Sequence, residues 1–137
     1  MDEISKVKNN GKPVLKLIWS DIDYLVDKLE VKINKEKLVF NSIYGVPRGG
    51  LVVAVMLSHR LNLPIVEAKG INKNTLIVDD ICDKGLTLKG IYESYNIIKH
   101  FELSTAVLHL RKLSEYSPTF YGQEIENEWI QYPWEDD

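Results

Sequence analysis

The sequence lacks most of the features that mark secreted, membrane and disulfide-bonded proteins. It has one cysteine, Cys82, so an internal disulfide cannot form and a reducing compartment is expected. No apolar run is long enough to cross a membrane, and the polar first residues, MDEISKVKNNGK, lack the apolar core of a signal peptide. These absences predict a cytoplasmic protein with no membrane partner.

Basic charge and metal-ligand spacing are missing as well. The net charge of −3 at pH 7 provides no general attraction to nucleic acid, so no nucleic-acid partner is expected. The three histidines, His59, His100 and His109, share no metal-ligand spacing with one another or with Cys82, which disfavours a zinc site. Acidic neighbours should raise the pKa of the Cys82 thiol, so we expect this residue to pack and not to act as a nucleophile.

What is present is the composition of an ordinary globular domain. Hydrophobic residues make up 45% of the 137 residues and charged residues 27%, which is enough to form one core and argues against disorder. No repeat, low-complexity linker or shift in composition divides the chain. We therefore expect a single domain over residues 1–137.

Apolar periodicity and turn residues predict alternating strands and helices. Ser20 and Asp23 resemble an N-cap pair, followed by helical spacing through Leu29. Strands are predicted at 38–46, 65–68, 75–81 and 104–110, helices at 51–61 and 87–101, a turn at 70–74, and extended pieces at 14–19 and 128–134. This alternation predicts an α/β fold with a central, mostly parallel sheet flanked by helices, and sites beyond the carboxyl ends of its strands.

A cluster of acids and a glycine turn follow the strand at 75–81. The residues concerned are Asp79, Asp80, Asp83, Lys84, Gly85, Leu86 and Thr87. A turn that enters a helix offers free backbone N–H groups to a phosphate, while carboxylates suit sugar hydroxyls or Mg²⁺. The combination favours a sugar-phosphate site. On spacing alone, a plain strand–turn–helix junction with Asp83 or Thr87 as the helix cap is an equal alternative.

The segment VDDICDKGLT resembles the phosphoribosyl pyrophosphate signature of type I phosphoribosyltransferases, in which two acids after an apolar strand precede Asp-Thr-Gly-x-Thr. Lys84 occupies the usual threonine position. The resemblance implies that Asp79 and Asp80 hold the ribose hydroxyls, directly or through Mg²⁺, and that residues 83–87 hold the 5′-phosphate. It also implies that Asp83 accepts or shares a purine-ring proton.

A second segment, YGVPRGGLVVA, follows the strand at 38–46. Alone it favours a tight turn with a surface arginine. Within the resemblance it is similar to the pyrophosphate loop of purine phosphoribosyltransferases, which implies that Arg48 and Gly49 face the pyrophosphate.

The segment from 106 to 135 is similar to the end of short microbial xanthine-guanine or hypoxanthine phosphoribosyltransferases. There a Trp-Ile-x-x-Pro-Trp-Glu run closes the base pocket, which implies that Trp129 stacks on the purine and that the Ile130 backbone meets its edge. The lysine that meets the purine O6 aligns with Arg111, and Lys112 follows it, so either cation is a candidate. Without the resemblance, the aromatic residues would simply pin the C-terminus to the core.

Taken together, the resemblance implies Mg²⁺-dependent transfer of the 5-phosphoribosyl group from phosphoribosyl pyrophosphate to guanine, xanthine or hypoxanthine, in a homodimer or homotetramer. The long flexible loop that usually closes over the active site is missing, because residues 70–74 span only a turn. This keeps open a non-catalytic module that binds phosphoribosyl pyrophosphate or a nucleotide, and a purely structural subunit. Retention of the three carboxylates favours the enzyme, since clustered acids repel one another without a cation.

Overall fold

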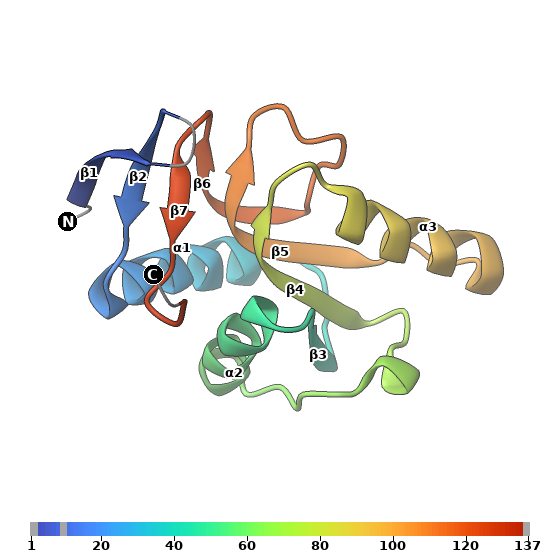
Figure 1. The fold of residues 1–137 in the computed structure, drawn as a ribbon. Helices are drawn as coiled ribbons and strands as arrows, with labels where there is room; N and C mark the ends of the chain where they lie inside the picture. Colours follow the sequence, from blue (N-terminus) through green and yellow to red (C-terminus); the bar gives the residue numbers. More distant parts are fainter. Residues whose placement is uncertain (1–2, 9–10, 136–137) are drawn as a thin grey trace.

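The computed structural model of the chain describes residues 3–8 and 11–135. Within these ranges the main sheet has four parallel strands in the order β3-β4-β5-β6 (Figure 1). Its strands are β3 (Ser42–Gly45), β4 (Thr75–Cys82), β5 (Ser104–Arg111) and β6 (Phe120–Ile125). The predicted α/β fold with a parallel central sheet is confirmed.

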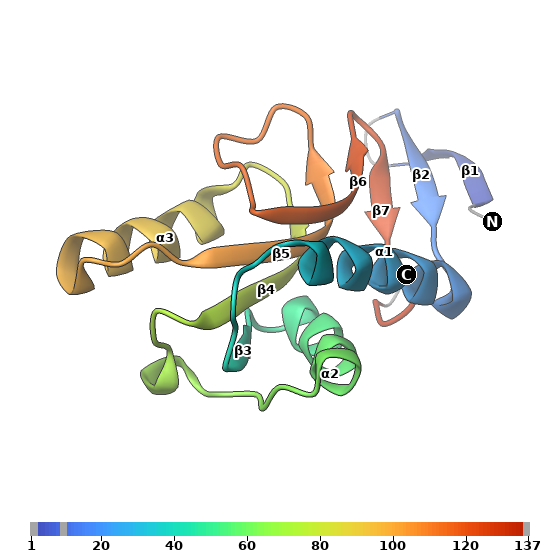
Figure 2. The same cartoon turned by 180° about the vertical axis from the view of Figure 1, so that it is seen from behind.

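A smaller sheet joins the two ends of the chain. Its order is β1 (Glu3–Lys8), β2 (Lys12–Lys16) and β7 (Trp129–Gln131). The β1–β2 pair is antiparallel, whereas β2 and β7 are parallel and pair Val14 with Trp129 and Leu15 with Ile130. Figure 2 shows this sheet beside the end of β6 and above the start of α1 (Trp19–Lys35). We call β1, β2 and β7 the hood sheet.

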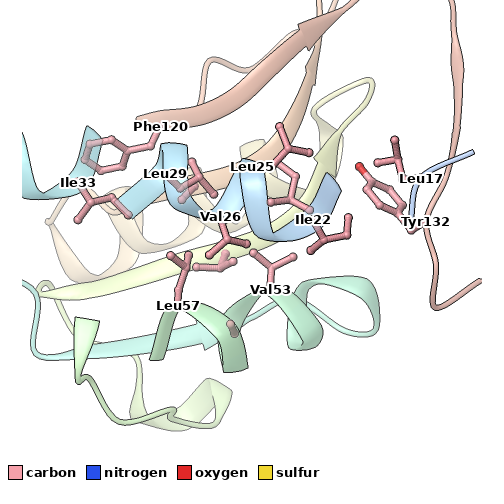
Figure 3. Packing of buried hydrophobic residues seen from close by; sticks show 14 of the residues in the cluster. Leu17, Ile22, Leu25, Val26, Leu29, Ile33, Val53, Leu57, Phe120 and Tyr132 are labelled. Carbon is pink, nitrogen blue, oxygen red and sulfur yellow. The ribbon is translucent and has the colours of Figure 1, made fainter. Parts of the chain in front are cut away.

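Both faces of the main sheet are buried, which explains the continuous apolar run of β4. Leu76 and Val78 point into the cluster formed with α1 and α2 (Gly49–Leu61), whereas Ile77 points to the side of α3 (Leu86–Lys99). Figure 3 shows how the apolar stripe of α1 meets α2 and the sheet through Ile22, Leu25, Val26, Leu29, Ile33, Val53, Leu57 and Phe120. Each such side chain contributes about 1.5–3 kcal/mol when it is fully buried.

The start of α1 differs from the prediction. The helix begins at Trp19, and the Asp21 carboxylate accepts a hydrogen bond from the backbone N–H of Ile18 at 2.9 Å. Ser20 therefore lies inside the helix and is not its cap. Asp23 is part of a surface ion-pair cluster and lies 3.4 Å from Arg60. The predicted N-cap at Ser20 is thus wrong by two residues: the N-cap is Ile18, and the acid that accepts from its N–H is Asp21, not Asp23.

Two further predictions needed correction. The strand expected at 65–68 is reduced to one bridge between Ile43 and Ile65, followed by a short 3₁₀ turn, η1 (Ala68–Gly70). No strand was predicted between residues 111 and 127, where the structure has β6. Within the described residues, no helix is long and apolar enough to cross a membrane.

Candidate functional site

The turn between β3 and α2 and the turn between β4 and α3 lie at the carboxyl ends of two neighbouring parallel strands (Figure 1). Together they line a pocket of about 540 Å³, which we call the phosphate pocket. Its lining includes every residue predicted to meet ribose, phosphate or pyrophosphate: Arg48, Gly49, Asp79, Asp80, Asp83, Lys84, Gly85, Leu86 and Thr87. The topology thus brings both predicted loops into one site.

Glycine allows the two turns to approach this closely. A Cβ atom at Gly49 would overlap the carboxylate of Asp80, and one at Gly50 would lie 2.6 Å from the carbonyl oxygen of Val78. Any side chain at these positions would push the Arg48 turn away from the acids. The pair of glycines after Arg48 therefore holds its turn against Asp79 and Asp80.

Two helices begin at the phosphate pocket with their backbone amides available. The N-cap of α2 is Arg48 and that of α3 is Gly85, and neither helix has a side-chain cap among the described residues. Gly85 has φ +83°, which a residue with a side chain rarely adopts. Asp83 and Thr87 are therefore not the helix cap. Uncapped N–H groups and the positive ends of two helix dipoles make this pocket suited to anions.

The two acids at the end of β4 are close to each other and partly buried. Asp79 Oδ1 accepts a hydrogen bond from the Asp80 backbone N–H at 2.8 Å, and Asp80 Oδ1 accepts one from the Ile81 N–H at 2.8 Å. Burial, followed by the neighbouring Asp80, raises the pKa of Asp79 to about 8. Burial and the neighbouring acid thus disfavour the charged form of Asp79, and a cation or hydroxyl donors beside it would favour that form again.

The donor set agrees with a shared Mg²⁺ ion more than with a protein-only metal cage. Among the described residues, no group of three or more His, Cys, Asp or Glu side chains could hold a metal ion. Mg²⁺ is commonly held by one or two carboxylates together with substrate phosphates and water. Asp79 and Asp80 supply that number of carboxylates beside a pocket suited to phosphate.

A second pocket of about 290 Å³ lies against the first and shares Asp83 and Lys84 with it. We call it the base pocket. Its other lining residues are Lys12, Arg111, Leu113, Glu115 and Trp129. One wall therefore comes from the end of β5 and the loop after it, and the other from the hood sheet.

Arg111 is rigidly held at the border of the base pocket. Its Nε donates to Asp83 Oδ1 at 2.6 Å, and its Nη1 donates to the backbone carbonyls of Glu126 and Glu128 at 2.8 and 2.9 Å. These bonds use three of the five N–H groups of the guanidinium and leave the two on Nη2 without a partner among the described residues.

The structure distinguishes Arg111 from Lys112, the two cations that the sequence offered as candidates to meet the purine oxygen. Lys112 lines neither pocket and lies 3.4 Å from the exposed Glu126 carboxylate. The side chain of Ile130 is buried in the main core, so only its backbone is available to a ligand. Trp129 is 44% exposed and lines the base pocket. Arg111 and Trp129 are thus the two predicted base-binding side chains that the fold places there.

Sequence reasoning missed other residues of the site. The acidic run at residues 135–137 predicts a solvated tail, but Glu135 lines the phosphate pocket and its Oε1 accepts a hydrogen bond from the Tyr132 N–H at 2.9 Å. Asp136 and Asp137, the rest of that tail, lie outside the described residues. Lys12 reaches the base pocket only because the distant strands β2 and β7 pair, and no local pattern signals that contact.

Tyr132 links the C-terminal segment to the strand that carries the acids. Its hydroxyl donates to the Asp80 carbonyl at 3.2 Å and lies 2.8 Å from Nδ1 of His109. Burial lowers the pKa of His109 to about 4, so the ring is neutral at pH 7 and its Nδ1–H can donate to the hydroxyl. The Tyr132 ring stacks on Trp134 with centroids 4.7 Å apart.

Cys82 is buried, as expected of a packing residue. Its Sγ lies 3.2 Å from Ser114 Oγ. Burial is the main cause that raises the pKa of its thiol, and the charges of Asp79 and Asp83 add to it, against the Ser114 hydrogen bond. The acidic neighbours named from the sequence contribute, but they are the smaller cause.

The connection that replaces the usual lid is short, as predicted. It folds into η1 and a turn in which the Thr75 N–H donates to the Asn72 carbonyl at 3.0 Å. The Asn41 N–H donates to the Asn74 carbonyl at 3.0 Å, which places this turn at the amino ends of β3 and β4. The phosphate pocket lies at the opposite ends of these strands, so this connection does not cover it.

The parallel sheet, the turns that follow β3 and β4, and the hood sheet together match the fold of the phosphoribosyltransferases. A purine phosphoribosyltransferase from Pyrococcus horikoshii is similar at 31% identity and TM-score 0.72, over 89% of this chain and 94% of that one. The chain belongs to the type I phosphoribosyltransferase family and resembles its microbial purine members.

Less similar solved structures share the fold. A xanthine-guanine-hypoxanthine phosphoribosyltransferase from Helicobacter pylori matches at 17% identity and TM-score 0.73, over 87% of this chain and 92% of that one. A hypoxanthine-guanine phosphoribosyltransferase from Bacillus anthracis matches at 17% identity and TM-score 0.65, over 93% and 85%. No family model matches the sequence, and no curated protein does.

Proposed function

We propose that this protein transfers the 5-phosphoribosyl group from phosphoribosyl pyrophosphate to a 6-oxopurine and releases pyrophosphate. The observation that carries the proposal is the contact between the two pockets. A site suited to phosphates and ribose shares Asp83 and Lys84 with a site that presents Trp129 and Arg111. A sugar phosphate in the first and a flat base in the second would meet at these shared residues.

In this proposal the phosphate pocket binds the donor substrate. The amides and hydroxyl of residues 83–87 hold the 5′-phosphate, and Arg48 with Gly49 faces the pyrophosphate. Asp79 and Asp80 hold the ribose hydroxyls or a Mg²⁺ ion shared with the pyrophosphate. When bound, Mg²⁺ would neutralise charge on the leaving group. The side chain of Arg48 has no hydrogen-bond or ion-pair partner within the described ranges and is therefore available to that leaving group.

The reaction breaks the bond between C1′ and the pyrophosphate oxygen, and the leaving group takes the electron pair. The purine N9 forms the new bond to C1′ and the ring loses a proton. Arg48 and the helix N-termini stabilise negative charge as it grows on pyrophosphate. Asp83, held by Arg111 through Oδ1, accepts or shares the purine-ring proton with its other oxygen. The two pockets fix the angle of attack.

Arg111 is our candidate for recognition of the base oxygen at position 6. Its two Nη2 N–H groups are without partners in the described part of the chain, and its other three are fixed by Asp83 and by the backbone carbonyls of Glu126 and Glu128. A donor held in this way loses little entropy when it binds an oxygen. Trp129 then covers one face of the ring.

The test is to mix the protein with Mg²⁺, phosphoribosyl pyrophosphate and guanine, xanthine or hypoxanthine separately, and to follow nucleotide and pyrophosphate. We expect product with at least one base and none without Mg²⁺. The Asp79→Asn/Asp80→Asn double variant should lose binding of phosphoribosyl pyrophosphate, whereas Glu93→Gln, an exposed carboxylate on α3, is the matched control. Unchanged binding by the double variant would count against the site.

The short connection at the far end of the sheet favours a second candidate function, a regulatory module that binds phosphoribosyl pyrophosphate or a nucleotide without turnover. Closure over the site normally excludes water and completes the catalytic arrangement. Tight, Asp79-dependent binding of phosphoribosyl pyrophosphate with no product from any base would favour this function over the enzyme.

A further inference from the structure

More cationic than anionic side chains line the base pocket. Its cations are Lys12, Lys84 and Arg111, and its carboxylates are Asp83 and Glu115. Arg111 and Asp83 neutralise each other at 2.6 Å. Glu115 lies 3.6 Å from Lys89, which is outside the pocket. Lys12 and Lys84 therefore remain as cations without an ion-pair partner among the described residues.

The hood sheet places Lys12 beside the stacking residue. Val14 pairs directly with Trp129, and Lys12 lies two residues before Val14 on the same strand. Side chains two residues apart in a strand share a face, so Lys12 and Trp129 project from one face of the hood sheet. Lys84 lines the same pocket from the turn between β4 and α3, at the border with the phosphate pocket. A ring stacked on Trp129 would thus lie in a pocket lined by two lysines from different elements.

The three candidate bases differ in how they suit such a pocket. All have an oxygen at position 6, but position 2 is an amino group in guanine, a hydrogen in hypoxanthine and an oxygen in xanthine. Ammonium groups only donate hydrogen bonds, so they match an oxygen and oppose an amino group. Xanthine is also the most acidic of the three and is partly anionic near neutral pH. An anion in a pocket lined by two unpaired cations is favoured, more so where water is displaced.

We infer that xanthine, bound as its anion, is the preferred base and that Lys12 determines this preference at position 2. The inference rests on the proposed function of the site, and it adds a ranking of bases that neither the sequence motifs nor the fold provides. It assigns a role to a lysine on β2, a strand that carries none of the three sequence motifs.

The experiment compares kcat/KM for xanthine, guanine and hypoxanthine in the natural chain, in Lys12→Gln and in Lys16→Gln. The control removes the same charge from the same strand at a residue that lines neither pocket. We expect the natural chain to prefer xanthine by about tenfold or more, which corresponds to one net hydrogen bond to a charged group. Lys12→Gln should reduce the xanthine-to-guanine ratio by about tenfold, and Lys16→Gln should leave it unchanged.

The pH dependence gives a second readout. KM for xanthine should fall as pH rises through the pKa of xanthine itself, and KM for hypoxanthine should show no such fall over the same range. A preference for guanine, or an equal loss for all three bases in Lys12→Gln, would overturn the inference.

Failure of the proposed function is distinguishable from failure of this inference. If no base gives product, equilibrium binding of xanthosine monophosphate and guanosine monophosphate provides the comparison. Tighter binding of xanthosine monophosphate that is lost in Lys12→Gln but kept in Lys16→Gln would support the inference without turnover. Equal binding of the two nucleotides would overturn it.

Discussion

The carboxyl group of Asp79 connects the stability of the protein to its chemistry. Its folded pKa is about 8, against an ordinary value of 3.8. Between these values the unfolded chain releases a proton that the folded chain keeps. Stability therefore falls as pH rises from about 4 to about 8, by about 1.4 kcal/mol per pH unit from this residue alone. A site that is costly to maintain when empty is one that a cation or sugar ligand would stabilise.

We predict that Asp79→Asn stabilises the ligand-free protein at pH 8, by about 2 kcal/mol or more, and has little effect at pH 4. Denaturant unfolding at both pH values measures this. Glu93→Gln, which removes an exposed carboxylate, should produce no such pH-dependent gain. The same Asp79 variant should bind phosphoribosyl pyrophosphate more weakly. If the Asp79→Asn variant were less stable than the natural chain at pH 8, the prediction would be wrong, because other groups would then already stabilise the charged carboxylate.

At the same scale, the hydroxyl of Tyr132 should contribute to both stability and binding. Tyr132→Phe would leave the Asp80 carbonyl and the His109 Nδ1–H without their partner in a buried place. The expected loss is about 1–3 kcal/mol of unfolding free energy, with weaker phosphoribosyl pyrophosphate binding because Asp80 is less well held. Tyr24→Phe, at a residue 47% exposed, is the control and should change neither.

At the scale of elements, the turn into α3 depends on Gly85. Gly85→Ala would force a side chain into a left-handed conformation and against Ser114 Oγ and the Tyr116 backbone nitrogen, which lies 2.8 Å from the Cβ position. We expect a loss of about 1–2 kcal/mol from the backbone conformation alone, together with loss of phosphate binding. Thermal unfolding and titration with phosphoribosyl pyrophosphate measure the two effects.

A glycine-to-alanine substitution at a second position of α3 should have the opposite effect on stability. Gly90 lies inside α3, and a Cβ atom there would meet nothing within 4 Å. Gly90→Ala should therefore stabilise the protein by about 0.5–1 kcal/mol and leave binding unchanged. If Gly85→Ala and Gly90→Ala lowered the stability equally, the claim that the left-handed turn at Gly85 specifically requires glycine would be wrong.

Elements were predictable where the signal was local. The strand β4 and the turns at Arg48 and Gly85 followed from apolar runs and glycine positions. The strand β6 did not, because Gly122 interrupts its pattern. Its Cβ position lies 2.8 Å from the Leu108 carbonyl and 3.1 Å from Leu25 Cδ2, so glycine is required for α1 and β5 to pack there. At Gly122 the close packing of α1 and β5 requires glycine, although glycine by itself does not favour a strand.

At the scale of the whole molecule, the base pocket is a product of chain topology. Lys12 and Trp129 lie at opposite ends of the sequence and meet only because β2 and β7 pair in parallel. The resemblance identified Trp129 and the pair Arg111–Lys112. Only the structure distinguishes Arg111 from Lys112, through the bonds that hold Arg111 to Asp83 and to the carbonyls of Glu126 and Glu128. The sequence therefore named most of the residues that line the phosphate pocket and only some of those that line the base pocket.

The short connection between α2 and β4 has a consequence for water at the reacting carbon. It turns back at the amino ends of β3 and β4, so it leaves the phosphate pocket open on the side where a lid would close. Water that reaches C1′ can replace the purine as the attacking group. We predict that, without any base, the protein releases pyrophosphate from phosphoribosyl pyrophosphate and Mg²⁺ at a measurable fraction of its transfer rate. The Asp79→Asn/Asp80→Asn variant sets the background for this measurement. Efficient transfer with base-free release no faster than that background would mean that another part of the protein, or a second copy of the chain, excludes water when the base binds.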